Sequence, residues 1–423
     1  MKISLFGQRF SLGGGTSRLM EDLGAPVLKG QERIMMGGGN PAAIPQLQQI
    51  FRQRMQQMLD DEGQECEFDS MLGAYDPPQG EGSFMSELAA LLQQMYGWDI
   101  TADNIALTNG SQSAFFCLFN MFAGRFSDGS FKQVLLPLAP EYIGYAEQGL
   151  EPGLFTSRRP EIELIGEHQF KYHVDFDALA IDDRIGAICV SRPTNPTGNV
   201  LTNDEIERLS LLAEQHNIPL LLDNAYGLPF PGLVYTDAAP YWREHIVLSL
   251  SLSKFGLPGT RTGIVIANPK IIDALSKINA IVNLASGSVG AAIARELVSS
   301  GEIIDLSENV IKPYYQTRMR TAFDHLATEL SAIPGLYFRI HRPEGAFFLW
   351  LWLPSLPVTS QQLYQRLKAR GVIIVPGHYF FPGLEEDWPH KNECIRISYA
   401  AEESVVKKGL SIIADEIREI FSE

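Results

Sequence analysis

The sequence is poor in cysteine and has no long apolar run. Its four cysteines, Cys66, Cys117, Cys189 and Cys394, lie far apart and include no C-x-x-C pair. A disulfide framework or a zinc site is therefore not expected, and a reducing compartment such as the cytoplasm fits best. No apolar stretch is long enough to span a bilayer, and residues 1–10 do not resemble a secretory signal. We expect a cytoplasmic protein with no metal site and no membrane partner.

Positive charge is also scarce, since the chain has 34 lysines and arginines but 50 acidic residues, which gives a formal net charge of −16. Binding of nucleic acid needs clustered lysine and arginine, so no nucleic-acid partner is expected. The 423 residues are 45% hydrophobic and 20% charged, which is typical of a folded chain with room for two domains.

Short apolar segments alternate with helical patterns through the middle of the chain. Six of them have the length and composition of buried strands: 104–108, 134–137, 187–191, 219–223, 247–250 and 263–267. Because these strands are apolar throughout, they predict a mostly parallel sheet covered by helices on both faces. One helix is marked by an apolar stripe and a glycine stop at Gly97, and the stripe comprises Phe84, Leu88, Leu91, Leu92 and Met95.

The pattern changes after about residue 300. A helical stretch over 302–330 is followed by strand patterns at 337–340 and 346–353 and by helical patterns at 360–369 and 402–421. This order indicates a second, smaller α+β unit. We predict a large domain over residues 46–301 and a small domain formed by residues 1–45 and 302–423.

Lys254 lies on a turn rich in glycine and proline, directly after a predicted strand. A lysine that forms a Schiff base has to be deprotonated in a partly dry pocket, which burial promotes. Ser251, Ser253 and Arg261 nearby could bind a phosphate. Taken alone, Lys254 would more often be a solvated loop lysine.

Asp223 ends another apolar strand, at the edge of a parallel sheet where ligands bind. A carboxylate there could keep a cofactor's ring nitrogen protonated, and Tyr226 could contact the same ring. Alternatively, Asp223 caps the following turn and Tyr226 only packs.

Three further segments have both a functional and a structural explanation. Gly110-Ser111-Gln112 opens a helix and could bind a phosphate, or Ser111 could be a plain N-cap. Asn195 lies in a turn held by two prolines, which could aim its amide into a pocket, or the segment could be only a rigid turn. Arg396 lies within an apolar strand, where a substrate carboxylate or an internal acidic residue could pair with it.

In this order the segments resemble the class I/II aminotransferases of pyridoxal phosphate (PLP) fold type I, over roughly residues 37–399. The resemblance rests on Gly110-Ser111-Gln112, Pro140-Glu141-Tyr142, Asn195-Pro196-Thr197-Gly198, Asp223-x-x-Tyr226, Ser251-x-Ser253-Lys254, Arg261 and Arg396, together with Tyr75 and Gly80. It implies an α/β fold whose large domain has a mostly parallel sheet of the seven-stranded type, beside a smaller α+β domain.

The resemblance also implies roles. Lys254 would hold PLP covalently and later move the substrate's α-proton, and Asp223 would pair with the ring nitrogen. Tyr226 and Asn195 would contact the phenolate oxygen, and Tyr142 would stack on the ring. The phosphate would be held by Gly110, Ser111, Gln112, Ser251, Ser253 and Arg261. Tyr75 would reach the phosphate of a neighbouring subunit in a homodimer with shared active sites. Arg396 and the backbone of Gly39 would bind the substrate carboxylate.

The expected substrates are amino acids and 2-oxoacids, exchanged in a ping-pong reaction. Residues 278–294 contain no lysine or arginine to pair with a second carboxylate, so small apolar side chains are favoured. The resemblance implies exchange of the amino group between valine and pyruvate, and the missing positive charge supports this expectation. Another small or aromatic amino acid, or a β-lyase reaction on the same fold, remains open. A dinucleotide-binding enzyme is disfavoured because Gly37-Gly38-Gly39 lacks the G-x-G-x-x-G spacing. A transcription regulator is disfavoured by the charge.

Overall fold

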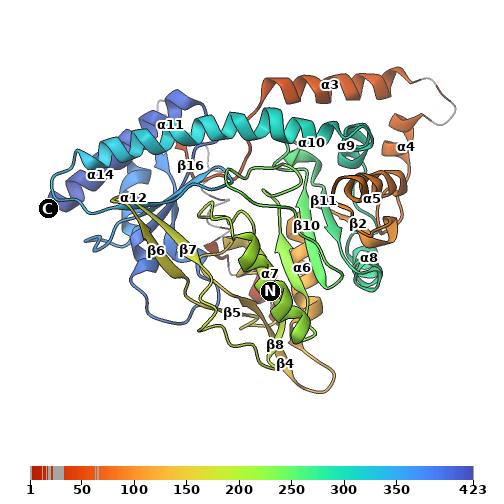
Figure 1. The fold of residues 1–423 in the computed structure, drawn as a ribbon, viewed down its shortest axis with the longest axis horizontal. Coiled ribbons are helices and arrows are strands. Elements are labelled where there is room, and N and C mark those ends of the chain that lie inside the picture. Colours follow the sequence, from red (N-terminus) through yellow and green to blue (C-terminus); the bar gives the residue numbers. More distant parts are fainter. Residues whose placement is uncertain are drawn as a thin grey trace.

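The structure is a computed structural model that describes residues 2–11, 13–15, 17, 21, 33–61, 63 and 66–422. Its larger sheet has the strand order β2-β11-β10-β9-β8-β4-β3, with β5 also paired to β4 (Figure 1). These strands are β2 (Ile105–Thr108), β3 (Gly124–Arg125), β4 (Phe131–Leu136), β5 (Phe155–Ser157), β8 (Ile185–Ser191), β9 (Leu220–Asp223), β10 (Ile246–Ser251) and β11 (Gly263–Ile266). Strands β10, β9, β8, β4 and β5 run parallel, whereas β11 is antiparallel to both neighbours. The predicted mostly parallel sheet is confirmed, and each of the six predicted strands is present.

The strands of this sheet are apolar throughout because both faces are covered. In β9, Leu220 and Leu222 join one buried cluster and Leu221 joins another, as the alternation of a strand requires. Helices α6 (Ser111–Phe122) and α8 (Pro269–Asn283) contribute to the cluster around Leu221. Helices α5 (Gly82–Tyr96), α7 (Asn203–Gln215) and α9 (Val289–Ser299) contribute to the other one.

Helix α5 confirms the predicted helix and its stop. Gly97 ends it in the left-handed conformation, with φ of 67°, where a side chain would add strain. Phe84 and Leu88 are buried, but Met95 at the last turn is 47% exposed, so the predicted stripe was wrong at its end.

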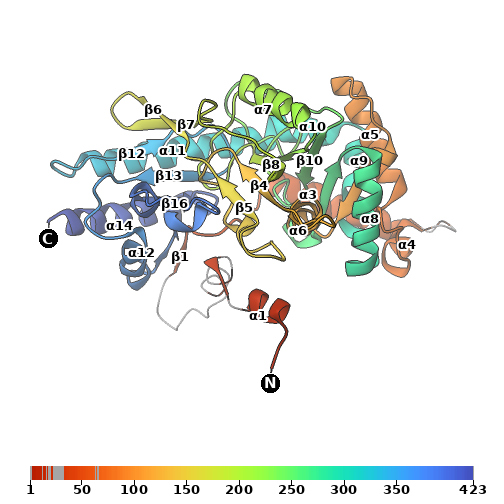
Figure 2. The ribbon, with the colours of Figure 1, turned by 90° about the horizontal axis from the view of Figure 1, so that it is seen from below.

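The second sheet has the order β15-β16-β13-β12-β7-β6 and lies beside the first in both ribbon views (Figure 2). Its strands are β6 (Glu161–Ile165), β7 (Gln169–His173), β12 (Arg339–His341), β13 (Phe348–Trp352), β15 (Val375–Pro376) and β16 (Cys394–Ser398). A separate two-stranded sheet pairs β1 (Ile34–Met35) with β14 (Val372–Ile373), which joins the N-terminal segment to this half of the chain. The β6–β7 hairpin comes from within residues 46–301 yet pairs with β12. The division into two domains at residues 45 and 301 stays a prediction.

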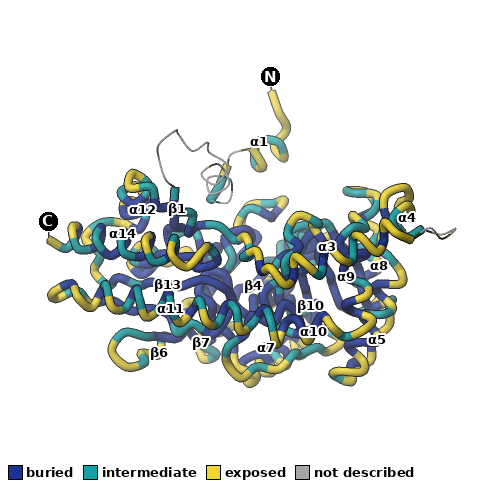
Figure 3. The backbone as a smooth tube through the Cα atoms, turned by 90° about the horizontal axis from the view of Figure 1, so that it is seen from above, coloured by how far each residue is buried: buried dark blue, intermediate teal, exposed yellow. Residues whose placement is uncertain are grey.

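A long helical stretch spans the two halves of the molecule, as predicted for residues 302–330 (Figure 1). It consists of α10 (Glu302–Leu306), a π-helical turn η4 (Ser307–Ile311) and α11 (Lys312–Ser331). Each helix of this stretch and α14 (Glu403–Ser422) has a buried side and a solvent side, visible as alternating colours in Figure 3.

The remaining helices are shorter or peripheral. They are α1 (Leu5–Ser11), α3 (Pro45–Asp60), α4 (Glu67–Gly73), α12 (Ser360–Ala369) and α13 (His390–Glu393). In the part of the chain that the structure describes, no helix has the length and apolar character needed to cross a membrane. Among the same residues, no cluster of histidine, cysteine and acidic side chains could hold a metal ion.

Candidate active site

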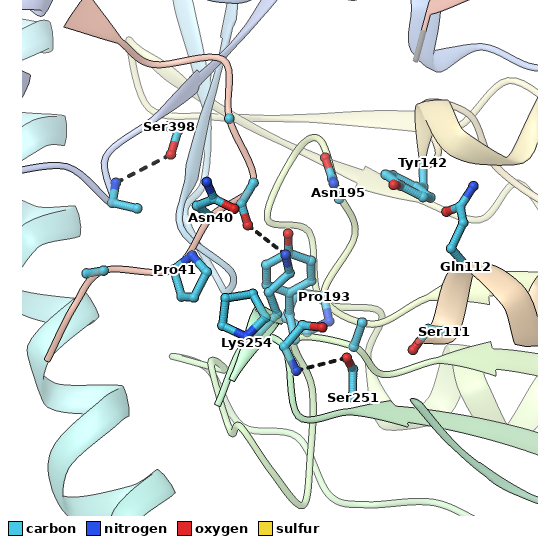
Figure 4. Close-up of a pocket in the computed structure, with 18 of the residues that line it drawn as sticks. Asn40, Pro41, Ser111, Gln112, Tyr142, Pro193, Asn195, Ser251, Lys254 and Ser398 are labelled. Atoms are coloured by element: carbon cyan, nitrogen blue, oxygen red, sulfur yellow. Dashed lines mark hydrogen bonds between the residues drawn. The ribbon is translucent and has the colours of Figure 1, made fainter. Parts of the chain in front are cut away.

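A cavity of about 880 Å³ opens where the parallel strands of the larger sheet end and the second sheet begins. The strand ends at Ser191, Asp223 and Ser251 face it from one side, and residues 38–43 and 398–402 border it from the other. Most of the predicted site residues line it, and Figure 4 labels several of them. Those that do are Gly39, Ser111, Gln112, Tyr142, Asn195, Asp223, Tyr226, Ser251, Ser253, Lys254, Arg261 and Arg396.

Lys254 follows β10 and points into the cavity toward the N-terminal loop (Figure 4). Its Nζ donates a hydrogen bond to the carbonyl oxygen of Gly39 at 2.6 Å. Burial, with the nearby charges of Arg396 and Arg261, lowers the pKa of Lys254 to about 8. A much larger fraction of this amine is neutral near pH 7 than for an ordinary lysine, which is what a nucleophilic lysine requires.

Asp223 is buried at the end of β9. Its Oδ2 accepts a hydrogen bond from the Tyr145 hydroxyl at 2.7 Å, and its Oδ1 accepts one from the Ala225 N–H at 3.0 Å. Burial raises the pKa of Asp223, and the bond from Tyr145 partly opposes that rise. Asp223 therefore caps the following turn and also lines the cavity. Tyr145, three residues after Tyr142, is a partner that the sequence analysis missed.

Tyr142 and Tyr226 supply aromatic rings to the cavity. The Tyr142 ring meets Tyr145 edge-on, with 5.3 Å between centroids, and Tyr226 packs in the same way on Phe347 at 5.2 Å. Burial raises the pKa of both cavity tyrosines, so both phenols stay protonated at neutral pH.

Glu141 holds the Tyr142 segment to the larger sheet. Its carboxylate accepts hydrogen bonds from the Ser191 N–H at 2.8 Å, the Ser191 hydroxyl at 2.5 Å and the Tyr142 N–H at 3.1 Å. Complete burial raises the pKa of Glu141 to about 7. The sequence quoted this residue within a motif but assigned it no role, because its partner Ser191 lies 50 residues away.

The start of α6 forms an anion site with Arg261. Gly110 precedes the helix with φ of 84°, and a Cβ there would lie 2.3 Å from Nη2 of Arg261. Glycine at 110 therefore lets the guanidinium approach the N–H groups at the helix start, where negative charge is favoured. Ser111, Ser251 and Ser253 border the same part of the cavity. Gly110 is not part of the lining itself, and Ser111 begins the helix rather than capping it.

Arg396 lies in the middle of β16 and is 2% exposed. Its Nη1 donates to Oδ1 of Asn195 at 2.6 Å, and its Nη2 donates to the Gly37 carbonyl at 2.5 Å. Its buried Nε has no hydrogen-bond partner among the described residues. Burial lowers the pKa of Arg396 to about 10, still far above neutrality. These partners are neutral acceptors, so the charge is left to attract an anion in the cavity.

Tyr75 is not brought to this cavity. Its side chain is 85% exposed, and its predicted role would require a second subunit. Residues 278–294 do not line the cavity either, because the end of α8 points outward, with Ile281 86% exposed. Their lack of positive charge therefore says nothing about the cavity of one chain.

The residues present fit PLP. A phosphate suits the Arg261 and α6 site, a carbonyl suits Lys254, and a ring nitrogen that carries a proton suits the buried carboxylate of Asp223. The fold and this combination of groups define a PLP enzyme of fold type I.

Comparisons with known proteins agree. Residues 151–413 match the family described as aminotransferase class I and II. The valine–pyruvate aminotransferase of Escherichia coli K12 is 52% identical over 423 residues, which covers 100% of both chains. A putative amino-acid aminotransferase from Psychrobacter arcticum 273-4 superposes with a TM-score of 0.96 at 45% identity, covering 100% of each chain. The valine–pyruvate aminotransferase of Salmonella typhimurium LT2 has a TM-score of 0.88 at 51% identity, covering 97% of this chain and 100% of the other. The chain belongs to the class I and II aminotransferases.

Proposed function

We propose that this enzyme exchanges the amino group between valine and pyruvate, giving 2-oxoisovalerate and alanine. The reaction is named in the Escherichia coli and Salmonella typhimurium relatives, each more than half identical to this chain. The observation that carries the proposal is the charge of the cavity. Among the described residues that line it, the cations are Lys254, Arg261 and Arg396.

Each of these three cations has a task that both substrates need. Arg261 faces the phosphate site, Lys254 provides the reactive amine, and Arg396 binds the α-carboxylate through its planar fork. A second carboxylate on the substrate would find no remaining cationic partner among the described residues that line the cavity. Small apolar side chains such as those of valine and alanine avoid this cost. Discrimination between these two is shallow, since a few methyl groups contribute only about 1–3 kcal/mol in an apolar pocket.

PLP, when bound, supplies a ring that accepts the electrons released as the substrate loses its α-proton. Lys254 Nζ carries that proton, because its lowered pKa of about 8 lets it take up and give back a proton near neutral pH. Asp223 keeps the ring nitrogen protonated, and Tyr145 keeps Asp223 in place. Tyr142 would pack on the ring, and Tyr226 and Asn195, which line the same cavity, would contact its oxygen substituent. The phosphate would be held by Ser111, Gln112, Ser251, Ser253 and Arg261, with Gly110 leaving room for Arg261, and the Gly39 backbone would assist Arg396.

A panel of amino donors tested against pyruvate examines the substrate proposal. We expect valine and other small apolar amino acids to give the highest rates of 2-oxoacid formation. Aspartate or glutamate as the best donor by a wide margin would contradict it.

We further propose that the enzyme is a cytoplasmic homodimer in which Tyr75 completes the phosphate site of the partner subunit. The exposure of Tyr75, Ile281 and Leu284 supports an apolar contact surface, and Asp76 accepts a hydrogen bond from Ser288, which ties the two segments together. The cysteines are unpaired, as a reducing compartment requires.

Hybrid dimers test the shared site. We expect Lys254→Ala and Tyr75→Ala subunits to be inactive or impaired alone, whereas their hybrid would contain one site with both residues intact. We expect mixing under subunit exchange to restore part of the activity. Proven exchange without recovery would mean that each site is built from one chain.

A further inference from the structure

A buried lysine outside the cavity is fully occupied with hydrogen bonds. Lys171 in β7 is 1% exposed. Its Nζ donates to Oδ1 of Asn199 at 2.9 Å, to the carbonyl of Val200 at 2.9 Å and to the carboxylate of Glu344. An ammonium group has three N–H donors, so each of them is used.

Glu344 is equally well held. It is 3% exposed and accepts hydrogen bonds from the Val200 N–H at 3.1 Å and from Nε of Arg342 at 2.8 Å. Both backbone groups of Val200 are thus held by this ion pair. We call Lys171, Glu344, Asn199 and Val200 the buried clip. It joins β7, the segment that follows Asn195, and the loop before β13.

The buried clip lies at the end of the turn that carries Asn195. The Thr194 N–H donates to the Asn199 carbonyl at 2.8 Å, and the Gly198 N–H donates to the Thr194 carbonyl at 2.8 Å. These bonds close the turn on itself, with Asn195 at one end and Asn199 at the other. On its far side the turn presses against the chain next to Glu344, because a Cβ on Gly198 would lie 2.6 Å from the Gly345 carbonyl.

Stability alone does not account for a charged pair at this place. Taking two charges out of water costs about as much as their attraction returns, and apolar residues of similar volume often do as well. Unlike apolar residues, the ion pair makes directional hydrogen bonds, and these fix the side-chain amide of Asn199 and the backbone of Val200 in one short segment. That segment sets where Asn195 meets Arg396, at 2.6 Å between Oδ1 and Nη1.

We propose that Lys171 and Glu344 are positioning residues of the carboxylate site. They hold the Asn195 turn so that Asn195 orients the Arg396 guanidinium for the substrate carboxylate. The proposal rests on the assignment of Arg396 to that carboxylate under the proposed function.

The test measures carboxylate binding in the holoenzyme. Isovalerate, which is valine without its amino group, is titrated into wild type, Lys171→Met, and the double variant Lys171→Met with Glu344→Gln. The double variant leaves no unpaired buried charge and so preserves folding. We expect its isovalerate Kd to rise about tenfold, because misplaced groups lose much of their binding energy. KM for valine and pyruvate should rise together, and kcat should change less. Borohydride fixation of the cofactor on Lys254 should not change.

Glu416→Gln is the matched control. Glu416 is 3% exposed and joins α12 to α14 through Arg366 and Arg370, and none of these three lines the cavity. It should lose thermal stability but keep its isovalerate Kd to within about twofold, since distant sites act independently. If the lysine variants do not fold, Asn199→Ala, which removes one hydrogen bond of the buried clip but keeps the Lys171–Glu344 ion pair, should still raise the Kd, by about threefold.

Two outcomes overturn the proposal in different ways. A folded clip variant that binds isovalerate like wild type would show that the pair is only structural. An Arg396→Lys variant that binds isovalerate like wild type would instead show that the carboxylate binds elsewhere, and the proposed function would fail first.

Discussion

The two ends of the active-site cavity are built in different ways. The Asp223 end is formed by strand ends of one sheet, and its hydrogen bonds come from Ala225 and Tyr145. The Arg396 end is assembled from three distant segments, with Gly37, Asn195 and Arg396 in direct contact. The first end therefore inherits its geometry from parallel strands, whereas the second depends on how the N-terminal loop and the second sheet meet the first. In the proposed mechanism, the Asp223 end acts on the cofactor ring and the Arg396 end binds the substrate carboxylate.

Lys254 lies between the two ends, and its loss should affect both. In Lys254→Ala we expect turnover to fall at least about 10⁴-fold, because covalent attachment and proton transfer disappear together. PLP should still bind through the phosphate site. Single-turnover rates and mapping of the borohydride adduct test this, and an adduct on another lysine would contradict the assignment.

Asp223→Ala should damage the ring end alone. We expect removal of the α-proton to slow about 10²–10³-fold, since a preorganised charge is lost where electrons accumulate. The isovalerate Kd should stay near that of wild type. A substrate deuterated at the α-carbon gives the rate of this step through its isotope effect. Loss of substrate affinity without loss of rate would identify Asp223 as a structural cap.

Arg396→Lys should damage the recognition end alone. A lysine cannot make the bidentate contact, and loss of a hydrogen bond between charged groups costs about 1.5–3 kcal/mol. We expect the Kd or KM of every substrate and of isovalerate to rise by about one to two orders of magnitude. Unequal losses among substrates would mean that Arg396 contacts side chains instead.

The pH dependence of cofactor attachment tests whether the pKa of Lys254 is lowered. The pKa of Lys254 is lowered to about 8 in the folded protein, so the reactive neutral amine predominates above that pH and becomes scarce below it. Reconstitution of the apoenzyme with PLP should therefore accelerate as pH rises toward 8 and level off above it. Absorbance of the bound cofactor follows the reaction, and a rate still rising steeply at pH 10 would indicate an unperturbed lysine.

Tyr145→Phe should have the smallest effect. Asp223 loses one hydrogen bond, at a cost of about 1 kcal/mol, which corresponds to a slowing of about fivefold in proton removal. Because Tyr145 lies at the ring end, isovalerate binding should be unchanged. A change in isovalerate binding of the same size would show that the two ends are coupled.

The same contrast explains what the sequence could predict. Asp223 and Ser251 end short apolar strands, and Lys254 lies in the turn after the second of them. The ends of parallel strands lie at the same edge of a sheet, so the sequence pattern alone predicts that these residues are close together. The burial of Arg396 could be predicted from its position in an apolar strand. Its hydrogen-bond partners, Gly37 and Asn195, could not be predicted, because they contact it only through the packing of separate segments.

Other features depend on contacts that no local pattern encodes. Glu141 and Ser191 are 50 residues apart, and Lys171 and Glu344 are 173 apart. The sequence of the β6–β7 hairpin does not show which sheet it joins. Its pairing with β12 in the second sheet depends on tertiary packing. The exposed Tyr75 contacts no part of the cavity, and its proposed role would need a second subunit.

The π-helical turn at Ser307–Ile311 has a mechanical consequence. The turn ends two residues before Pro313, which has no N–H to donate, and the helical stretch from α10 to α11 continues without a break. The 20 residues of α11 extend for about 30 Å beyond it. A bend of only about 10° at this point would move the far end of such a lever by roughly 5 Å. A bend of this kind beside the larger sheet would therefore be amplified at the end of α11, where the helix packs on α14.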